Sequence, residues 1–418
     1  MTAVAAVAVL LTGGCSSVSS STTSTAGALP TGAHPGYQDV HRDQLSPLII
    51  SAIAPDPIPV KGSDNRFHVD YELSILNFSP RPATITKVET LGGNENGPVL
   101  STLTQPQIAA NSLLAGDYPA SPASVTVIPP GNTLILVLSD AYAARGAVPT
   151  AVTHRVFATF GPVPSGQNYL STFYPDQAAQ IGGSVLTSKL QPVVIGPPVE
   201  GNGWLAGNGL ADGELNTHRS AVLPIGGRIS GTERYAVDWA RVDPATKPIQ
   251  DALFKGDPSK NASYLAFGQP LLAVADGTVV SVVSDQPDIA PGELLGGLPF
   301  DQLTGNRVVL DIGHGVFALY AHMEQNSMTV KVGEKVKKGE VIGRLGNSGN
   351  TTSPHLHFQL MRSSLPLTGD NVPWEIESFT LVGTARAAGV VSGPDSGPRS
   401  NELPLGNTVS NFATPARS

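Results

Sequence analysis

Histidines concentrate in the C-terminal half of the sequence, and two of them are separated by a single residue. Five of the nine histidines lie between His218 and His357. His355 and His357 occur in the segment SPHLHFQL, and His322 occurs in ALYAHM. In a strand, side chains two residues apart share a face, with Cα atoms about 7 Å apart. One imidazole of such a pair could hold a metal ion while the other reaches a water or substrate at that ion. Two histidines on a strand also arise by chance, so the surrounding sequence must decide.

Strand-rich sequence surrounds these histidines and predicts a domain over residues 216–382. Its clearest strand segments are AVADGTVVSVVSD, NRVVLDIGHG, VFALYAHM and KGEVIGRLGNSG. Runs of β-branched residues bounded by glycine turns are typical of strands. Residues 286–304 interrupt two of these strands, and loops of that length are usually functional or disordered.

The run GEKVKKGEVIGRLGNSGNTTSPHLHFQL resembles the signature of the lysostaphin-type zinc metallopeptidases, in which a glycine-rich hairpin leads into N-S-G-x-x-x-x-x-H-L-H-F. Upstream, LAVADGTVVSV is similar to the strand that opens the core sheet of that family, and NRVVLDIGHGVFALYAHM to the strands that deliver its Y-x-H motif. The resemblance covers about residues 216–362. It implies an exported Zn²⁺ enzyme that hydrolyses peptide bonds of peptidoglycan cross-links.

The same resemblance implies individual roles for the histidines. His357 would be a zinc ligand, while His322 and His355 would be catalytic, polarising the water at the zinc and stabilising the oxyanion that forms on the peptide carbonyl. Neutral imidazoles suit this task because a dication opposes their protonation. Asp238, in GTERYAVDWAR, aligns with the aspartate ligand of the family's H-x-x-x-D motif.

Arg234 stands where that motif has its first histidine. A guanidinium group has no acceptor and stays protonated, so it cannot ligate zinc, and it could pair bidentately with Asp238. In one interpretation His218, in NTHRSAVLP, supplies the missing ligand; His314, at an expected exposed hairpin turn, is a poorer candidate. In the other interpretation the zinc site is broken, and the domain binds cell wall or activates cell-wall amidases, as degenerate members of the family do. We favour the zinc enzyme.

Residues 45–165 show short strand patterns without a catalytic constellation. The apolar side chains of FHVDYELSILNF fall on one face: Phe67, Val69, Tyr71, Leu73 and Ile75. Strands at this spacing, separated by Gly and Pro turns, predict an immunoglobulin-like β-sandwich. The expected fold class is therefore all-β, with this sandwich followed by a lysostaphin-type β-sheet domain.

The opening sequence MTAVAAVAVLLTGGCSS contains an apolar segment, residues 1–15, that ends at Cys15 and resembles a bacterial lipoprotein signal. Lipidation of Cys15 would anchor the exported protein to the membrane of the cell envelope, whereas a plain secretory signal is the alternative. Residues 16–44 are rich in Ser, Thr, Gly and Pro and predict a flexible tether. An exported substrate-binding lipoprotein would explain the anchor and the sandwich, but not the histidines.

Amino-acid composition indicates the character of the remaining segments and restricts the possible partners. Residues 166–215 are dominated by Pro and Gly and predict a connector, and residues 383–418 predict a disordered tail. The net charge of −8, without a visible basic patch, argues against nucleic acid as a partner. Cys15 is the one cysteine of the sequence, so it excludes both an internal disulfide and a cysteine zinc cluster.

Overall fold

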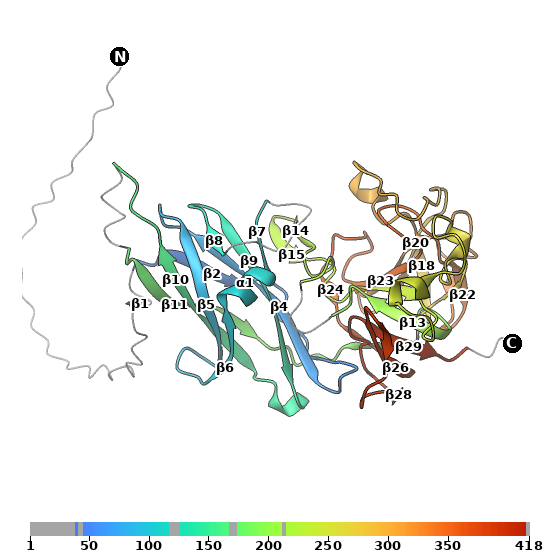
Figure 1. The fold of residues 1–418 in the computed structure, drawn as a ribbon, viewed down its shortest axis with the longest axis horizontal. Helices are drawn as coiled ribbons and strands as arrows, with labels where there is room; N and C mark the ends of the chain where they lie inside the picture. The colour runs from blue at the N-terminus through green and yellow to red at the C-terminus, as the bar shows by residue number, and fades with distance from the viewer. Residues whose placement is uncertain (1–37, 41–44, 117–125, 167–173, 211–214, 415–418) are drawn as a thin grey trace, which may run out of the picture. The chain divides into compact units, whose positions relative to one another are not determined.

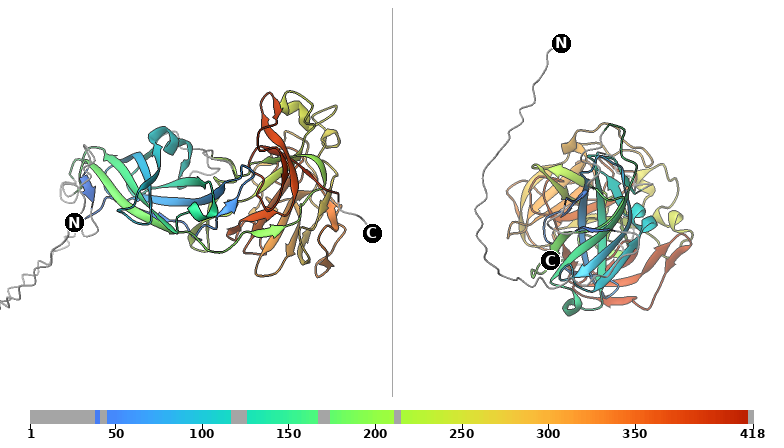
Figure 2. Two further views of the ribbon diagram at one scale, coloured as in Figure 1. Left: turned by 90° about the horizontal axis from the view of Figure 1, so that it is seen from below. Right: turned by 90° about the vertical axis from the view of Figure 1, so that its left-hand side faces the viewer.

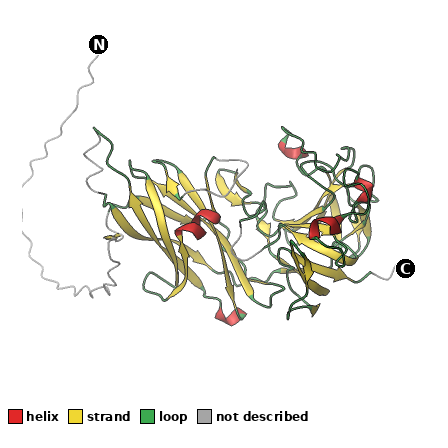
Figure 3. Cartoon of the chain, viewed as in Figure 1, coloured by secondary structure: helices red, strands yellow, loops and turns green. Residues whose placement is uncertain are grey.

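Strands dominate the computed structural model of the chain (Figures 1 and 3). It describes residues 38–40, 45–116, 126–166, 174–210 and 215–414. The expected signal with Cys15, and the expected tether apart from residues 38–40, lie outside the described residues. Within the described ranges, no helix has the length and apolar character needed to cross a membrane. The helical elements are α1 (Gln105–Ala110) and the 3₁₀ turns Arg145–Ala147, Ile249–Leu253, Asn261–Ser263 and Phe300–Gln302.

Two sheets of the N-terminal half, which we call the N-terminal sheet pair, share one core. The first consists of β1 (Gln38–Val40), β11 (Gln177–Leu186), β10 (Ala151–Phe160), β5 (Ala83–Gly92) and β6 (Val99–Thr104) in that order, with β8 (Val127–Ile128) beside β5. The second consists of β2 (Leu48–Ala52), β4 (Phe67–Asn77), β9 (Thr133–Tyr142) and β7 (Ser112–Leu114), with β3 (Val60–Lys61) beside β4. The core contains Val69, Tyr71, Leu73 and Ile75 of β4, four of the five side chains predicted to share a face.

The C-terminal half is organised around a twelve-stranded sheet. Its order is β21 (Lys335–Val336), β18 (Gly277–Val283), β19 (Asn306–Asp311), β20 (Phe317–Met323), β23 (Leu356–Met361), β16 (Val237–Arg241), β13 (Gly201–Gly207), β29 (Thr408–Phe412), β26 (Phe379–Arg386) and β27 (Gly389–Val391), with β24 (Asn371–Val372) beside β23 and β28 (Gly397–Arg399) beside β26. Three strand pairs complete the fold: β12 (Val193–Ile195) with β25 (Trp374–Ile376), β14 (Val222–Ile225) with β15 (Arg228–Gly231), and β17 (Pro270–Leu272) with β22 (Val341–Arg344).

The prediction of a disordered tail was wrong for residues 383–414. β29 pairs with both β13 and β26, so the red C-terminal strands in Figures 1 and 2 continue the large sheet. Val409 and Phe412 of β29 are buried, which gives this weakly charged segment enough apolar surface to order it. The expected connector is also built into the fold, because β11 completes the N-terminal sheet pair and β13 lies beside β16.

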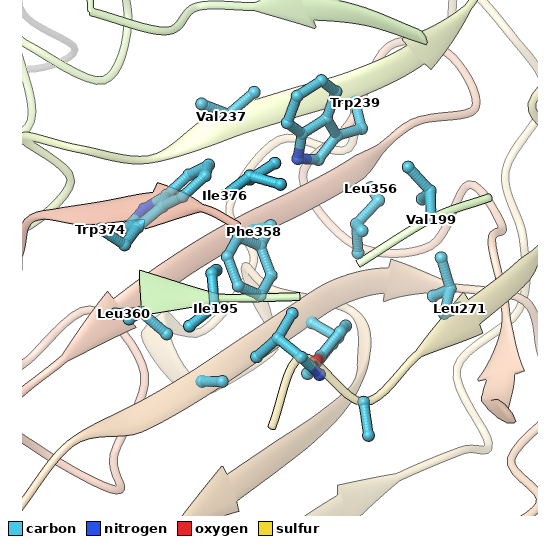
Figure 4. Close-up of a cluster of buried hydrophobic side chains, with 14 of the residues drawn as sticks. Ile195, Val199, Val237, Trp239, Leu271, Leu356, Phe358, Leu360, Trp374 and Ile376 are labelled. Atoms are coloured by element: carbon cyan, nitrogen blue, oxygen red, sulfur yellow. Dashed lines mark hydrogen bonds between the residues drawn. The ribbon is translucent and has the colours of Figure 1, made fainter. Parts of the chain in front are cut away.

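Along β16 and β23, successive side chains point alternately into the core of the large sheet and to its polar face. Trp239 on β16 and Leu356 and Phe358 on β23 lie among the buried side chains shown in Figure 4, together with Trp374. The intervening residues, Asp238 and His357 among them, consequently point to the opposite face of the sheet. A tightly packed aromatic core therefore fixes the two strands from which these polar side chains emerge.

Candidate metal centre

Asp238 and His357 lie directly opposite each other on the neighbouring antiparallel strands β16 and β23. Nδ1 of His357 is 3.1 Å from Oδ1 of Asp238. His218 comes from the turn before β14, and its Nε2 is 3.2 Å from the same carboxylate oxygen. One ligand atom from each of the three residues lies within 4.8 Å of the others. Two imidazole nitrogens and a carboxylate oxygen form a ligand set that suits zinc and leaves a fourth position open.

The remaining two histidines predicted for the site lie beside this group. Nε2 of His355 is 3.4 Å from Oδ1 of Asp238. The ring of His322 is centred 4.8 Å from the ring of His355 and 6.0 Å from the ring of His357. His322 has a left-handed backbone, with φ of 60°, which is uncommon for a residue other than glycine and typical of functional sites. The structure thus brings together residues that are up to 139 positions apart in sequence, His218 and His357 being the extremes.

Each of the four histidines has its outward-facing ring nitrogen engaged by an oxygen. For three of them the acceptor is a backbone carbonyl: Nδ1 of His218 lies 3.0 Å from the oxygen of Asn208 and 3.2 Å from that of Ala236, Nδ1 of His322 lies 2.8 Å from that of Ser348, and Nδ1 of His355 lies 2.8 Å from that of Ser353. A carbonyl only accepts, so the proton of each neutral ring sits on Nδ1. The unprotonated Nε2 then faces the cluster, as in metal-binding histidines.

For the fourth histidine, His357, the acceptor is the side-chain oxygen of Gln359, two residues further along β23. Its side-chain amide donates to the carbonyl of Thr232, at 3.1 Å, which turns Oε1 of Gln359 towards His357. Nε2 of His357 donates to that oxygen at 2.9 Å, so Nδ1 is left free to face Asp238. Gln359 was not predicted from sequence, although its spacing from His357 places both side chains on one face of the strand.

Burial and the interactions of the histidines with Asp238 and with one another shift the pKa values in the cluster. Burial lowers the pKa of His218, but the charge and hydrogen bond of Asp238 outweigh it and raise the pKa to about 9. Burial raises the pKa of Asp238, whereas His218 and His355 bring it well below its usual value. Burial and the two neighbouring histidines lower the pKa of His322 to about 3, so its imidazole is neutral at neutral pH.

A cavity of about 600 Å³ opens over the cluster. Its lining includes all five predicted site residues, namely His218, Asp238, His322, His355 and His357. Leu294 and Leu303, from the long loop over residues 286–304, line the same cavity, as does the carboxylate residue Glu233. The long loop over residues 286–304 therefore contributes to the wall of the cavity that contains the cluster.

Arg234 does not pair with Asp238, which corrects one expectation from the sequence. Its guanidinium group is buried and makes a two-point ion pair with Glu72 of β4; the Nε–Oε1 distance is 3.0 Å. Burial lowers the pKa of Arg234, but Glu72 outweighs it and keeps the arginine charged. The second oxygen of Asp238 instead accepts a hydrogen bond from the Asn208 amide, at 2.8 Å. His314, as expected, is exposed at a hairpin turn and is not part of the cluster.

Residues 263–369 match Peptidase family M23. The chain carries an M23 peptidase domain. Three histidines of the cluster, His322, His355 and His357, lie within the matched residues of the M23 domain, whereas His218 and Asp238 precede them.

Curated relatives of the M23 domain include several named endopeptidases. The chain is 35% identical over 101 residues to glycyl-glycine endopeptidase ALE-1 of Staphylococcus capitis, covering 24% of each chain. It is 29% identical over 154 residues to peptidoglycan DD-endopeptidase ShyA of Vibrio cholerae, covering 34% of this chain and 30% of that protein. It is 30% identical over 140 residues to lysostaphin of Staphylococcus simulans, covering 33% of this chain and 25% of that protein. The chain thus spans about a quarter to a third of the length of these relatives.

Proposed function

We propose that this protein is a zinc metallopeptidase of the bacterial cell envelope that hydrolyses peptide bonds of peptidoglycan cross-links. The group formed by His218, Asp238 and His357 carries the proposal, because its three ligand atoms converge and each imidazole turns one ring nitrogen towards Oδ1 of Asp238. The M23 relatives named as glycyl-glycine and peptidoglycan endopeptidases support the substrate class. The cell envelope follows from that substrate.

The chemistry divides between the metal and the two further histidines. His218, Asp238 and His357 would hold the zinc, which would supply Lewis-acid activation of the peptide carbonyl and of water. His322 and His355 line the cavity, and the neutral form of each ring, with its proton on Nδ1, would have Nε2 available to take a proton from the attacking water and return it to the departing amine. Once protonated, each can donate a hydrogen bond to the developing oxyanion. Leu294 and Leu303 of the long loop supply apolar contacts for an extended peptide in the cavity.

The alternative is a domain that binds cell wall or activates amidases without cutting, and it rests on Arg234. His218 weakens that alternative because it provides a third ligand atom beside Asp238 and His357. The two functions make opposite predictions for metal content and for cleavage. Purified protein should contain about one zinc per chain and release new amino termini from peptidoglycan. A chelator should abolish the release, and added zinc should restore it. Protein that takes up no zinc and leaves peptidoglycan intact would instead be the non-cutting binder.

We also infer that the N-terminal sheet pair is an immunoglobulin-like sandwich forming one domain, and that the M23 domain with its flanking strands forms a second. Two sheets over a single core support this inference. The domain bounds proposed from the structure then extend beyond residues 45–165 and 216–382, because β11 joins the first domain and both β13 and β29 join the second.

Lipid anchoring at Cys15 is a separate part of the proposal, supported by the apolar run and small residues before that cysteine. We expect the wild-type precursor, expressed in a bacterium, to partition into the detergent phase, because an acylated cysteine buries its chains in the membrane. Cys15→Ser should release the protein into the aqueous phase, as measured by immunoblotting both phases. Equal partitioning of the two forms would show that no anchor is attached at this position.

A further inference from the structure

We propose that the N-terminal sheet pair is a structural part of the metal centre, and that Asp70 and Glu72 of β4 are positioning residues for the segments that carry His218 and Asp238. This inference rests on the proposed zinc site and adds a requirement to it. A zinc ligand must be held within about 0.5 Å of its productive position. Besides their contacts with the large sheet, both segments make buried ion pairs with β4.

Asp70 fixes the segment that carries His218. Nη1 of Arg219, the residue after His218, donates to Oδ1 of Asp70 at 2.7 Å. The other terminal nitrogen of Arg219 donates to the backbone carbonyl of Leu138 on β9, at 3.1 Å. Asp70 and Arg219 are 0% and 3% exposed. An unpaired charge at either position would remain buried, so the contact strongly resists separation.

Glu72 fixes the segment that leads to Asp238. The ion pair of Glu72 with Arg234 is buried on both sides and engages both carboxylate oxygens. Arg234 is four residues before Asp238 and three before the start of β16. Asp70 and Glu72 are two residues apart on β4, so they share the face opposite the core of the N-terminal sheet pair. One strand therefore presents both carboxylates to the two segments.

Between the two ion pairs, apolar side chains of the β14–β15 region pack against the N-terminal sheet pair. The hairpin β14–β15 connects the His218 turn to Arg234 and lies on the outer face of the second N-terminal sheet. The apolar cluster there consists of Ile53, Leu113 and Ile135 from the sheet pair with Leu215, Val222 and Ile229 from the hairpin region. The chain from residue 215 to residue 234 thus contacts the N-terminal sheet pair near its start, in its middle and at its end. This stretch contains His218 and ends four residues before Asp238.

The test compares Asp70→Asn and Glu72→Gln with Glu89→Gln in the full chain. Glu89 is a matched control because it is also buried and ion-paired, with Arg155 at 2.9 Å, but it lies on β5 in the other sheet. Zinc affinity is measured by competition with a chelator, at a temperature where all proteins are folded. We expect Asp70→Asn and Glu72→Gln to weaken zinc binding about 10–100-fold, the usual effect of losing support behind a ligand, and Glu89→Gln to leave it within about two-fold. Visible spectra of the cobalt-substituted proteins should change for the first two variants only.

The outcomes distinguish a failure of this inference from a failure of the proposed function. Wild-type affinity and an unaltered cobalt spectrum in both β4 variants would overturn the inference while leaving the zinc enzyme intact. A wild-type protein that takes up no zinc would overturn both. If the β4 variants do not fold, hydrogen exchange of wild-type protein replaces them. Zinc should then slow exchange at β4 and the β14–β15 hairpin but not at β5, because coupling between two sites is reciprocal. Unchanged exchange at β4 would contradict the inference.

Discussion

The His218→Ala protein is expected to take up no zinc under conditions in which the wild-type chain binds about one ion. Removing the His218 imidazole leaves Asp238 and His357 as the remaining members of the ligand group, and two protein ligands are too few for a stable catalytic zinc. Metal content is measured after dialysis against a weak chelator, together with the melting temperature. We expect the largest single loss of zinc from this substitution because His218 is buried and its Nε2 faces the centre of the site.

His314→Ala is the matched control for His218→Ala. His314 is exposed at a turn outside the cluster, so its removal should change neither the zinc content nor the melting temperature. If His218→Ala retained as much zinc as His314→Ala, another residue would have to be the third ligand, and the assignment of His218 would be wrong.

His322→Ala and His355→Ala should each keep zinc and lose hydrolysis. Neither residue belongs to the three-ligand group, but both point Nε2 into the cavity beside it. Loss of a proton-transfer group or oxyanion donor typically lowers the rate about 10²–10⁴-fold. The measurement is the rate at which amino termini appear from peptidoglycan, with zinc content and melting temperature recorded for the same samples. Zinc-loaded variants that retained activity within about five-fold of wild type would exclude these histidines from the mechanism.

The residues that the structure brings together in the cluster had been singled out from sequence, but the contacts that hold them there had largely not. The M23 match and the mostly β fold agree with the sequence analysis, because the motif around His355 and His357 is local and specific. His218 followed from the need for a further ligand, although it lies outside the matched residues. The carbonyl acceptors behind the histidines depend on where loops return to the sheet, and no local pattern encodes that position.

Glu72 illustrates why a long-range contact escapes pattern analysis. Along β4, apolar and polar residues alternate as they do in a strand with one face in solvent. Yet Asp70 and Glu72 are buried, because Arg219 and Arg234 cover that face from positions 149 and 162 residues away. The same distance explains the error for Arg234, whose nearest acidic residues in sequence are Glu233 and Asp238. The alternation of apolar and polar residues along β4 identifies its two faces, but it does not show what covers the polar face.

The pairing of Arg219 and Arg234 with β4 limits how this protein can be recombined with other domains. In a modular protein, a catalytic unit can be joined to a new neighbour as long as the linker is long enough. Here the exchange of the N-terminal sheet pair for an unrelated fold would leave two guanidinium groups facing a surface without matching carboxylates. Such a chimera would need acidic residues grafted at the positions of Asp70 and Glu72. The unit of engineering is therefore the N-terminal sheet pair together with the M23 domain rather than the M23 domain alone.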